Sequence, residues 1–428
     1  MPEKLVIIGN GMAPGRMLEQ LFELAPHKYE VTIFNAEPRV NYDRIMLSPV
    51  LSGEKQFADI IIHDDDWYRA HGVTLHKGAK VTKIDRENKT VSTASITAKG
   101  LCAAYDVLVV ATGSSPFIVP VQGHDLAGVV AYRDLDDVNA MLESTSDGTH
   151  AVVIGGGLLG LEAAAGLMAR GMNVTVLHLM PTLMERQLDT AAGYLLKRTL
   201  QGRGMNVITE ANTKAILGDE TVRAVQLEDG TQVRADIVVM AVGIRPASAL
   251  ASDANILVNR GIVVDDVMRS SDLSIYALGE CAEHRGMVYG LVAPLYEMAA
   301  VLAQHLAGHK AQYTGSLTST KLKVAGIDLF SAGDFAEGED REEIVLRDAS
   351  AGIYKRLVLK DNQIIGAVLY GESADGAWFF DMLKRGTNIS EMRESLIFGQ
   401  AYQGGAPLDP TAAVAALPDD AQTAVATA

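Results

Sequence analysis

The chain carries one pattern twice, in which a short apolar run is followed by closely spaced glycines and then by a segment with apolar residues on one face. In the first copy, Lys4–Ile8 is the apolar run, Met17–Leu24 is the one-faced segment and Glu30–Phe34 is a second apolar run. A short, continuously apolar run between turn signals is typical of a strand buried on both faces of a parallel sheet. The pattern therefore predicts a strand–turn–helix–strand unit. The glycines of its turn are Gly9, Gly11 and Gly15.

The second copy begins near residue 150. It predicts a strand over Ala151–Ile154, a glycine turn over Gly155–Gly160, a helix that ends at Arg170 and a strand over Asn173–Leu177. Gly171 stands where a helix commonly ends in a left-handed residue. One such glycine pattern is a weak signal, whereas two copies, each between a predicted strand and a predicted helix, are a strong one.

Two further segments resemble each other. Tyr105–Pro116 and Ala235–Pro246 are each an apolar run that ends in a turn of small residues, and each follows a stretch with the texture of a β-meander. Leu273–His284 predicts another buried strand that ends at Gly279, and Ala293–Leu306 predicts a helix.

The pattern of apolar and polar residues changes from about Thr314. The segments that follow predict an antiparallel sheet with a helix and a hairpin turn at Asp361–Gln363. From Gly404 the chain is rich in Ala, Pro and Asp and has no apolar face, which predicts a flexible tail or linker.

Composition narrows the class of protein. The 428 residues include 48% hydrophobic and 21% charged residues, as in an ordinary globular protein with two or three domains. The formal net charge of −16 argues against nucleic acid and anionic membranes as partners. No signal peptide or membrane helix is indicated, so we expect a cytoplasmic protein. The two cysteines, Cys102 and Cys281, are too few for a disulfide framework, and the ten histidines form no ligand motif, so no metal site is predicted.

Glycines after a buried strand let the backbone approach a pyrophosphate, which the free N–H groups of the following helix can bind. The first turn fits this use, although Pro14 stands at the third glycine position, where the first turn of a helix tolerates it. Glu37, after the second strand, is a candidate for the ribose hydroxyls, and Asn35 could share that role. The alternative is a tight turn without a ligand. The candidate residues of this turn are Gly9, Gly11, Met12, Ala13 and Pro14.

The second turn is a complete fingerprint, but His178 stands where an acid usually follows the second strand. Arg186 would favour the extra phosphate of NADP, and Glu185 would favour NAD, so the choice between the two nucleotides stays open. The candidate residues of this turn are Gly155, Gly157, Leu158, Leu159 and Gly160.

Taken together, the motifs GNGMAPG, ATG at 111–113, GGGLLG, AVGIRP and YALGE resemble the two-dinucleotide flavoprotein reductases related to glutathione reductase. The resemblance implies an α/β fold with two Rossmann-like dinucleotide-binding domains and a C-terminal α+β interface domain. It implies that residues 1–113 and 245–312 bind FAD, that 114–244 bind NAD(P)H, and that 313–403 form the interface domain, followed by the tail at 404–428.

A closer resemblance covers residues 37–55, 180–189, 279–297 and 318–334, which are similar to the N-terminal flavoprotein part of the large subunit of assimilatory NAD(P)H–nitrite reductase. This implies an electron-input module that takes a hydride from NAD(P)H and passes electrons to an iron–sulfur or sirohaem protein. Two alternatives stay open, namely a stand-alone rubredoxin- or ferredoxin-type reductase and a non-enzymatic flavin-bound redox sensor. A homodimer is also kept open.

The resemblance also implies roles for single residues, none of them a catalytic acid or base. Arg44 and Ser48 lie in a motif found beside the flavin in ferredoxin and rubredoxin reductases, but Pro49 replaces the usual Lys. Glu162 matches a Glu near the nicotinamide. The alternatives are an Arg44 that pairs with a surface acid and a Glu162 that is a plain helix-surface residue. The other cofactor candidates are Val81, Ala111, Thr112, Gly113, Gly279, Glu280, Pro294 and Leu295 for FAD, and Val242 and Gly243 for the nicotinamide nucleotide.

Several conspicuous residues have a simpler interpretation. Cys281 is expected to be a buried filler, and the methionines at 180, 184 and 205 are expected in the core. Trp67 and the aromatic group at 378–380 are expected in the core or an interface. A basic patch for an acidic protein partner would comprise Lys321, Lys323, Lys384 and Arg385.

Overall fold

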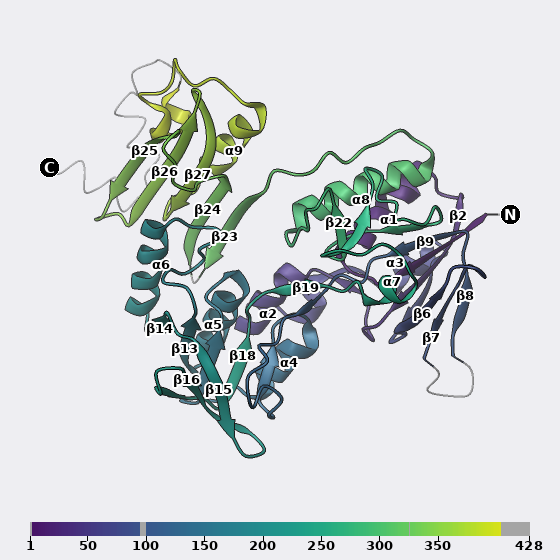
Figure 1. Ribbon diagram of the computed structural model, residues 1–428, viewed down its shortest axis with the longest axis horizontal. Helices are drawn as coiled ribbons and strands as arrows, with labels where there is room; N and C mark the ends of the chain where they lie inside the picture. Colours follow the sequence, from purple (N-terminus) through teal and green to yellow (C-terminus); the bar gives the residue numbers. More distant parts are fainter. Residues whose placement is uncertain (1, 95–99, 325, 404–428) are drawn as a thin grey trace. The chain divides into compact units, whose positions relative to one another are not determined.

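The computed structural model describes residues 2–94, 100–324 and 326–403, which form two units (Figure 1). The first unit comprises Met1–Arg186 and Gly193–Thr318, and the second comprises Gln187–Ala192 and Ser319–Ala428. The tail predicted from residue 404 lies outside the described residues.

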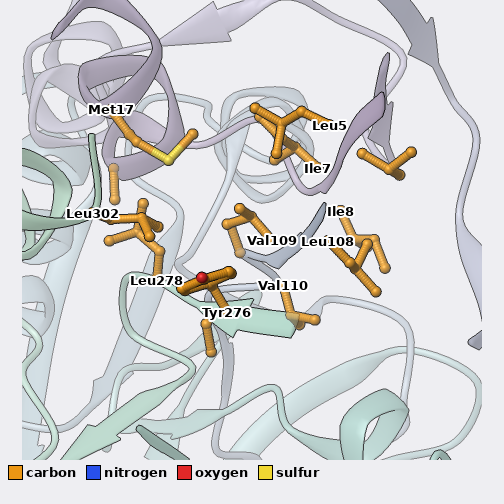
Figure 2. Close-up of a cluster of buried hydrophobic side chains, with 14 of the residues drawn as sticks. Leu5, Ile7, Ile8, Met17, Leu108, Val109, Val110, Tyr276, Leu278 and Leu302 are labelled. Carbon is orange, nitrogen blue, oxygen red and sulfur yellow. The ribbon is translucent and has the colours of Figure 1, made fainter. Parts of the chain in front are cut away.

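A parallel sheet in the order β21-β9-β1-β2-β5 forms the first half of the first unit. Its apolar strands are buried on both faces, and α1 and α8 lie side by side (Figure 1). Leu5, Leu108, Tyr276 and Met17 are among the core side chains seen in Figure 2. The elements are β1 Glu3–Ile8, α1 Met12–Leu24, β2 Tyr29–Asn35, β5 Thr74–Lys77, β9 Val107–Val110, β21 Ile275–Ala277 and α8 Val292–Ala307.

A second parallel sheet, in the order β11-β18-β12-β13-β14, repeats the arrangement around the second glycine turn. Its strands are β11 Val129–Ala131, β12 His150–Ile154, β13 Asn173–His178, β14 Asn206–Thr209 and β18 Ile237–Met240. Its helices are α4 Leu135–Glu143, α5 Leu158–Ala169 and α6 Thr190–Gly202.

The two echoing segments are the crossings between these sheets. The chain leaves the first sheet after β9 through β10 Ser114–Pro116, and it returns from β18 through β19 Ile244–Pro246. The two crossing strands pair with each other in antiparallel fashion, with Ser114 opposite Pro246. The second dinucleotide unit is therefore inserted into the first.

Shorter elements complete the first unit, including the two meanders that the sequence predicts. The meander strands are β6 Val81–Asp85, β7 Thr90–Thr93, β8 Cys102–Ala104, β15 Thr213–Gly218, β16 Val222–Leu227 and β17 Gln232–Arg234. The remaining elements are β3 Asn41–Tyr42, η1 Arg44–Met46, α2 Leu47–Ser52, η2 Phe57–Ile60, β4 Ile61–His63, α3 Asp65–Ala70, α7 Ala249–Asp253, β20 Ile262–Val264 and β22 Ala282–His284.

The second unit is an antiparallel sheet in the order β23-β24-β27-β26-β25 with helix α9 against it. Asp361 and Asn362 have φ of 50° and 56° and join β26 to β27, as the predicted hairpin requires. The elements are β23 Ser319–Val324, β24 Ile327–Gly333, β25 Glu342–Asp348, β26 Ile353–Lys360, β27 Gln363–Tyr370, α9 Gly376–Arg385, η3 Leu396–Phe398 and η4 Gln400–Tyr402.

The sequence-based expectations were wrong in two details. Helix α1 begins at Met12 rather than Met17, because Pro14 lies in the first turn, where its missing N–H leaves no gap in the helix. Met184 and Met205 are buried as expected, but Met180 is 43% exposed because β13 already ends at His178. Among the described residues, no helix is both long and apolar enough to cross a membrane.

Candidate functional site

The first glycine turn is shaped by close contact on one side and open space on the other. Gly9 has φ of +107°, and a Cβ there would lie 2.1 Å from the carbonyl oxygen of Ala111. Gly11 begins α1 without a side-chain cap, and a Cβ there would meet no atom within 4 Å. The first N–H groups of α1, at Met12 and Ala13, therefore face space that is free for an anion such as a pyrophosphate.

Buried polar side chains hold this turn in place. The Nδ2 of Asn41 donates to the carbonyl oxygens of Asn10, at 2.9 Å, and Gly11, at 2.7 Å. The Tyr68 hydroxyl donates to Oδ1 of Asn10 at 2.9 Å. The sequence analysis missed these residues. Their signal is faint, because each acts on a turn that is about 30 residues or more away.

Glu37 lies just beyond β2, where a ribose-binding acid is expected, and it is 17% exposed. The Tyr42 hydroxyl donates to its carboxylate at 2.8 Å, and Arg44 and Arg39 pair with it. Asn35 is 7% exposed and donates to the Arg39 carbonyl oxygen at 2.8 Å. Asn35 is buried, whereas Glu37 keeps part of its side chain exposed, so Glu37 is the more accessible candidate of the two.

The ends of β9 and β21 approach the same turn. Gly113 and Gly279 both have positive φ, and a Cβ on Gly279 would lie 3.5 Å from Cβ of Ala13 in α1. The Thr112 hydroxyl donates to the Ala247 carbonyl oxygen at 2.6 Å. The residues that a cofactor pyrophosphate and its linker would need are therefore gathered at one sheet edge, which is where open α/β sheets bind ligands.

Glu280 is held at this edge by a partner that sequence reasoning missed. Arg133 forms an ion pair with its carboxylate, and the Ser114 hydroxyl donates to Oε2 of Glu280 at 2.8 Å. Arg133 is the second residue after the end of β11. Its place just beyond the carboxyl end of a parallel strand is the signal that could have identified it.

Three candidates are apolar and lie in the core or at its edge. Val81 is buried at the start of β6, and Pro294 and Leu295 are buried in the first turn of α8. Their side chains offer packing, and any hydrogen bond from these residues to a cofactor would come from the backbone.

The second glycine turn repeats the geometry of the first. Gly155 has φ of +122°, and a Cβ there would lie 2.2 Å from the Ala241 carbonyl oxygen. A Cβ on Gly160 would lie 1.9 Å from the Gly155 carbonyl oxygen, so the third glycine allows α5 to approach the turn. Gly157 begins α5 with nothing within 4 Å of a Cβ. A second open helix N-terminus is thus present, and its first N–H groups, those of Leu158 and Leu159, face space that is free for an anion.

The residues around the end of β18 lie next to this turn. Val242 is 36% exposed, and Gly243 has φ of +117° with nothing within 4 Å of a Cβ. Ala241 donates its N–H to Ile154 at 2.9 Å, which fixes this segment beside β12.

His178 is not directed outward as a ribose ligand. Its ring is 7% exposed, Nδ1 accepts from the Gly156 N–H at 3.0 Å, and Nε2 lies 3.1 Å from Oε2 of Glu185. Arg186 is exposed. The structure thus brings the Glu185 carboxylate beside His178, the last residue of β13.

The short helix α2 places Ser48 against α5. The Ser48 hydroxyl donates to Oε2 of Glu162, and it lies 2.8 Å from the hydroxyl of Tyr132. Burial raises the pKa of Glu162 above its ordinary value, which the hydrogen bond from Ser48 partly offsets. Interpreting Glu162 as a plain helix-surface residue is therefore wrong. Tyr132 was missed by the sequence analysis because the contact spans 84 residues.

Arg44 contacts two of the segments described above. It pairs with Glu37 and donates to the Arg133 carbonyl oxygen at 3.1 Å. The acid it pairs with is thus not a surface acid but the carboxylate proposed for a ribose. Arg44 links the predicted FAD residues to the segment that holds Glu280.

The remaining expectations concern residues away from the turns. Cys281 is buried, its thiol lies 3.4 Å from the Val110 carbonyl oxygen, and burial raises its pKa, as fits a filler. Phe379 is fully buried in the second unit, and Trp67 packs against the core of the first. In the part of the chain that the structure describes, no group of three or more His, Cys, Asp or Glu side chains is placed to hold a metal ion.

Comparison with known proteins agrees with this geometry. Residues 3–301 match the family described as pyridine nucleotide-disulphide oxidoreductase, and residues 319–387 match the rubredoxin NAD+ reductase C-terminal domain. Among solved structures, NADH:rubredoxin oxidoreductase from Clostridium acetobutylicum is 26% identical with a TM-score of 0.76, covering 92% of this chain and 97% of that one. The predicted α/β fold class is confirmed.

Curated relatives are more similar in sequence. The NAD(P)H nitrite reductase of Bacillus subtilis (strain 168) is 48% identical over 98% of this chain and 51% of its own length. The assimilatory nitrate reductase electron transfer subunit of the same organism is 43% identical over 92% of this chain and 51% of its own. The chain therefore spans about half the length of these relatives. The expected cofactors, FAD and NAD(P)H, agree with the family and with these names. The chain belongs to the pyridine nucleotide-disulphide oxidoreductase family.

Proposed function

We propose that this chain is the electron-input module of assimilatory nitrite or nitrate reduction, which takes a hydride from NAD(P)H and passes electrons through FAD to a redox partner. The observation that carries the proposal is the presence of two open helix N-termini, at Gly11 and Gly157, in one folded unit. The similarity to a nitrite reductase and to a nitrate reductase electron transfer subunit supports the direction of the electrons.

The proposal assigns residues 1–113 and 245–312 to FAD and 114–244 to NAD(P)H. The first turn, Glu37, Arg44 and the Glu280 edge would hold FAD, and the second turn would hold the nicotinamide nucleotide. Bound FAD supplies the conversion between a two-electron donor and one-electron acceptors. The chain's own part is to bind and orient the two nucleotides, and no side chain is assigned as a catalytic acid or base.

Ser48 and Glu162 are proposed to position the reacting rings. They connect α2, in the segment assigned to FAD, to α5, in the segment assigned to NAD(P)H. Burial raises the pKa of Glu162, so its carboxyl keeps a proton up to a higher pH than an exposed glutamate does. The hydrogen bond from Ser48 holds this carboxyl and fixes the geometry between α2 and α5.

The electron acceptor is proposed to be an iron–sulfur or sirohaem protein or domain, and the compartment is proposed to be the cytoplasm. A rubredoxin- or ferredoxin-type reductase is the second candidate, because residues 319–387 match the rubredoxin NAD+ reductase C-terminal domain. The similarity to the Vibrio vulnificus (strain YJ016) nitric oxide reductase FlRd-NAD(+) reductase, 31% identical over 78% of this chain and 87% of that protein, also favours it.

The test is a reduction assay on the purified chain loaded with FAD. Reduction of the flavin by NADH or NADPH without oxygen, followed by turnover with ferricyanide, would support an enzyme. Bound FAD that neither nucleotide reduces would leave only the sensor alternative. Faster turnover with a sirohaem nitrite reductase domain than with rubredoxin supports the first candidate, and the opposite order supports the second.

A further inference from the structure

At the end of β13, a histidine and a nearby glutamate, His178 and Glu185, stand where a single acidic residue is usual. His178 occupies the strand end where the dinucleotide fingerprint usually has a carboxylate that binds the ribose and repels the extra phosphate of NADP. The His178 ring packs over the glycine turn, since a Cβ on Gly156 would lie 2.8 Å from Cγ of the ring. The histidine is therefore part of the turn rather than a side chain free to reach a ligand.

The hydrogen bonds of the ring define its tautomer. Nδ1 faces the N–H of Gly156 at 3.0 Å, so it must be the unprotonated acceptor. Nε2 faces the Thr182 carbonyl oxygen at 3.0 Å and the Glu185 carboxylate at 3.1 Å, so it carries the hydrogen and donates it. Both ring nitrogens are used inside the protein, and neither is left to bind a 2′-phosphate.

The segment after β13 returns to the same turn. The N–H of Met184 donates to the Gly156 carbonyl oxygen at 3.0 Å, and Met184 has φ of 53°. Gly156 is thus bound on one side by His178 and on the other by the residue that precedes Glu185. These contacts hold the Glu185 carboxylate beside the strand end, with 34% of its side chain exposed.

We propose that Glu185, positioned by His178, takes over the discriminating role of the missing strand-end acid, so that the second dinucleotide unit prefers NADH to NADPH. This inference rests on the proposed function, in which that unit binds NAD(P)H. The carboxylate accepts from ribose hydroxyls of NADH, and it repels the phosphate dianion that NADPH carries on the 2′ oxygen. His178 acts through Glu185 and is a positioning residue.

Arg186, the neighbour with the opposite charge, does not cancel this effect. Among the described residues nothing forms a hydrogen bond or ion pair with its exposed side chain. An unheld arginine must lose much of its rotamer freedom before it can hold a phosphate, whereas the carboxylate of Glu185 is already held by His178. The fixed negative charge therefore dominates at this edge.

The experiment compares NADH and NADPH with the FAD-loaded chain, by flavin reduction kinetics and by equilibrium titration with NAD+ and NADP+. We expect kcat/KM and binding both to favour the nucleotide without the phosphate by about tenfold or more, the order expected for a carboxylate facing a dianion at a partly exposed edge. The difference should shrink as salt is added.

Three variants locate the effect. Glu185→Gln keeps the acceptor for His178 but removes the charge, and it should raise NADPH efficiency about tenfold while changing NADH by less than about threefold. Glu228→Gln, at an exposed residue of the meander, makes the same change of charge and should leave the ratio unaltered. His178→Asp added to Glu185→Gln places an acid on the strand end itself and should restore the NADH preference.

The outcomes separate this inference from the proposed function. Equal use of both nucleotides, a preference for NADPH, or a ratio that Glu185→Gln does not move would overturn the inference alone. Failure of both nucleotides to bind or to reduce the bound flavin would overturn the proposed function.

Discussion

At the scale of single residues, burial decides which polar groups keep their ordinary chemistry. Glu162 lies on α5 with its carboxyl removed from water and hydrogen-bonded by Ser48, and its pKa is raised. Arg44 keeps 28% of its side chain exposed and has a carboxylate partner in Glu37. The two residues illustrate two ways of carrying a polar group into a protein, by a hydrogen bond from a neutral group or by an ion pair.

The raised pKa of Glu162 predicts a stability effect of defined sign. The native state holds the proton more tightly than the unfolded state, so the contribution to stability is complete below the unfolded pKa of about 4.3 and is lost as pH rises through the higher folded value. Glu162→Gln keeps an acceptor for Ser48 and removes the titration. We therefore expect the difference in Tm between the variant and the wild type to shift in favour of the variant between pH 4 and pH 8.

Glu143→Gln on the exposed end of α4 is the matched control, and it should show no such trend. A Glu162→Gln variant whose Tm runs parallel to the wild type across this pH range would contradict the raised pKa.

The glycines that precede the two open helices, Gly11 before α1 and Gly157 before α5, support a second prediction at this scale. Gly11 and Gly157 have φ of −80° and −85°, which any residue can adopt, and a Cβ on either meets no protein atom within 4 Å. A valine there is therefore tolerated by the fold, yet it fills the space that a pyrophosphate needs. We expect Gly157→Val to reduce kcat/KM for NAD(P)H by about 100-fold or more, because the substrate is misplaced, while bound FAD and reduction by dithionite persist.

Gly11→Val is the matching change in the first turn, and it should release FAD instead. The two variants are compared by flavin absorbance after gel filtration and by reduction with NADH and dithionite. Loss of FAD from Gly157→Val, with retention in Gly11→Val, would mean that the cofactors are assigned to the two turns in reverse.

At the scale of elements, α2 is held by α5. Arg170, at the end of α5, donates from Nε to the Leu51 carbonyl oxygen at 2.7 Å and from Nη2 to that of Val50 at 3.2 Å. A Cβ on Gly166 of α5 would lie 2.8 Å from the Leu51 side chain. The last carbonyl groups of α2, which have no partner within the helix, are thereby satisfied by a cation, the favourable arrangement for a helix C-terminus.

From this contact we predict that Arg170 affects both the free energy of unfolding and the rate at which NAD(P)H reduces the flavin. Arg170→Met removes the charged donor and should lower the free energy of unfolding by about 1.5–3 kcal/mol, the range for hydrogen bonds to charged groups. It should also slow flavin reduction by NAD(P)H, because α2 carries Ser48. Chemical denaturation and stopped-flow reduction measure the two effects. Arg203→Met, at an exposed residue, is the control, and an equally small change in both variants would contradict the coupling.

The elements also show what the sequence can predict. Buried runs such as Leu5–Ile8 and glycines such as Gly155 identify strands, turns and the two dinucleotide units, because these signals are local. Arg133 and Tyr132 were missed because their partners, Glu280 and Ser48, are 147 and 84 residues away. The contacts of His178 with Gly156 and Glu185 were not predictable for the same kind of reason, since the return of the chain to Gly156 is a property of the folded loop.

At the scale of the whole molecule, charge constrains the electron acceptor. With a formal net charge of −16, the chain repels acidic partners at long range, so docking of a small acidic redox protein needs a local basic patch. Lys321, at the start of β23, is exposed, and so are Lys384 and Arg385 at the end of α9. Arg385 already pairs with Asp381 at 3.1 Å, which leaves Lys321 and Lys384 as the stronger of the exposed candidates. The side chain of Lys323, the remaining candidate, lies outside the described residues.

Charge reversal at two of these residues tests both the acceptor and the role of the module. Lys321→Glu with Lys323→Glu should slow electron transfer to a protein acceptor, most strongly at low salt, and leave ferricyanide reduction intact, because rim charges act mainly on the association rate. Lys83→Glu with Lys214→Glu, two exposed lysines of the first unit, changes the net charge equally and should have a smaller effect. Equal loss with both acceptors would mean that Lys321 and Lys323 serve the fold or the flavin.

The sequence has only two cysteines, Cys102 and Cys281, which are too few to ligate an iron–sulfur cluster. We therefore expect that the chain alone does not reduce nitrite with either nucleotide, and nitrite turnover by it would contradict the proposed role as an input module.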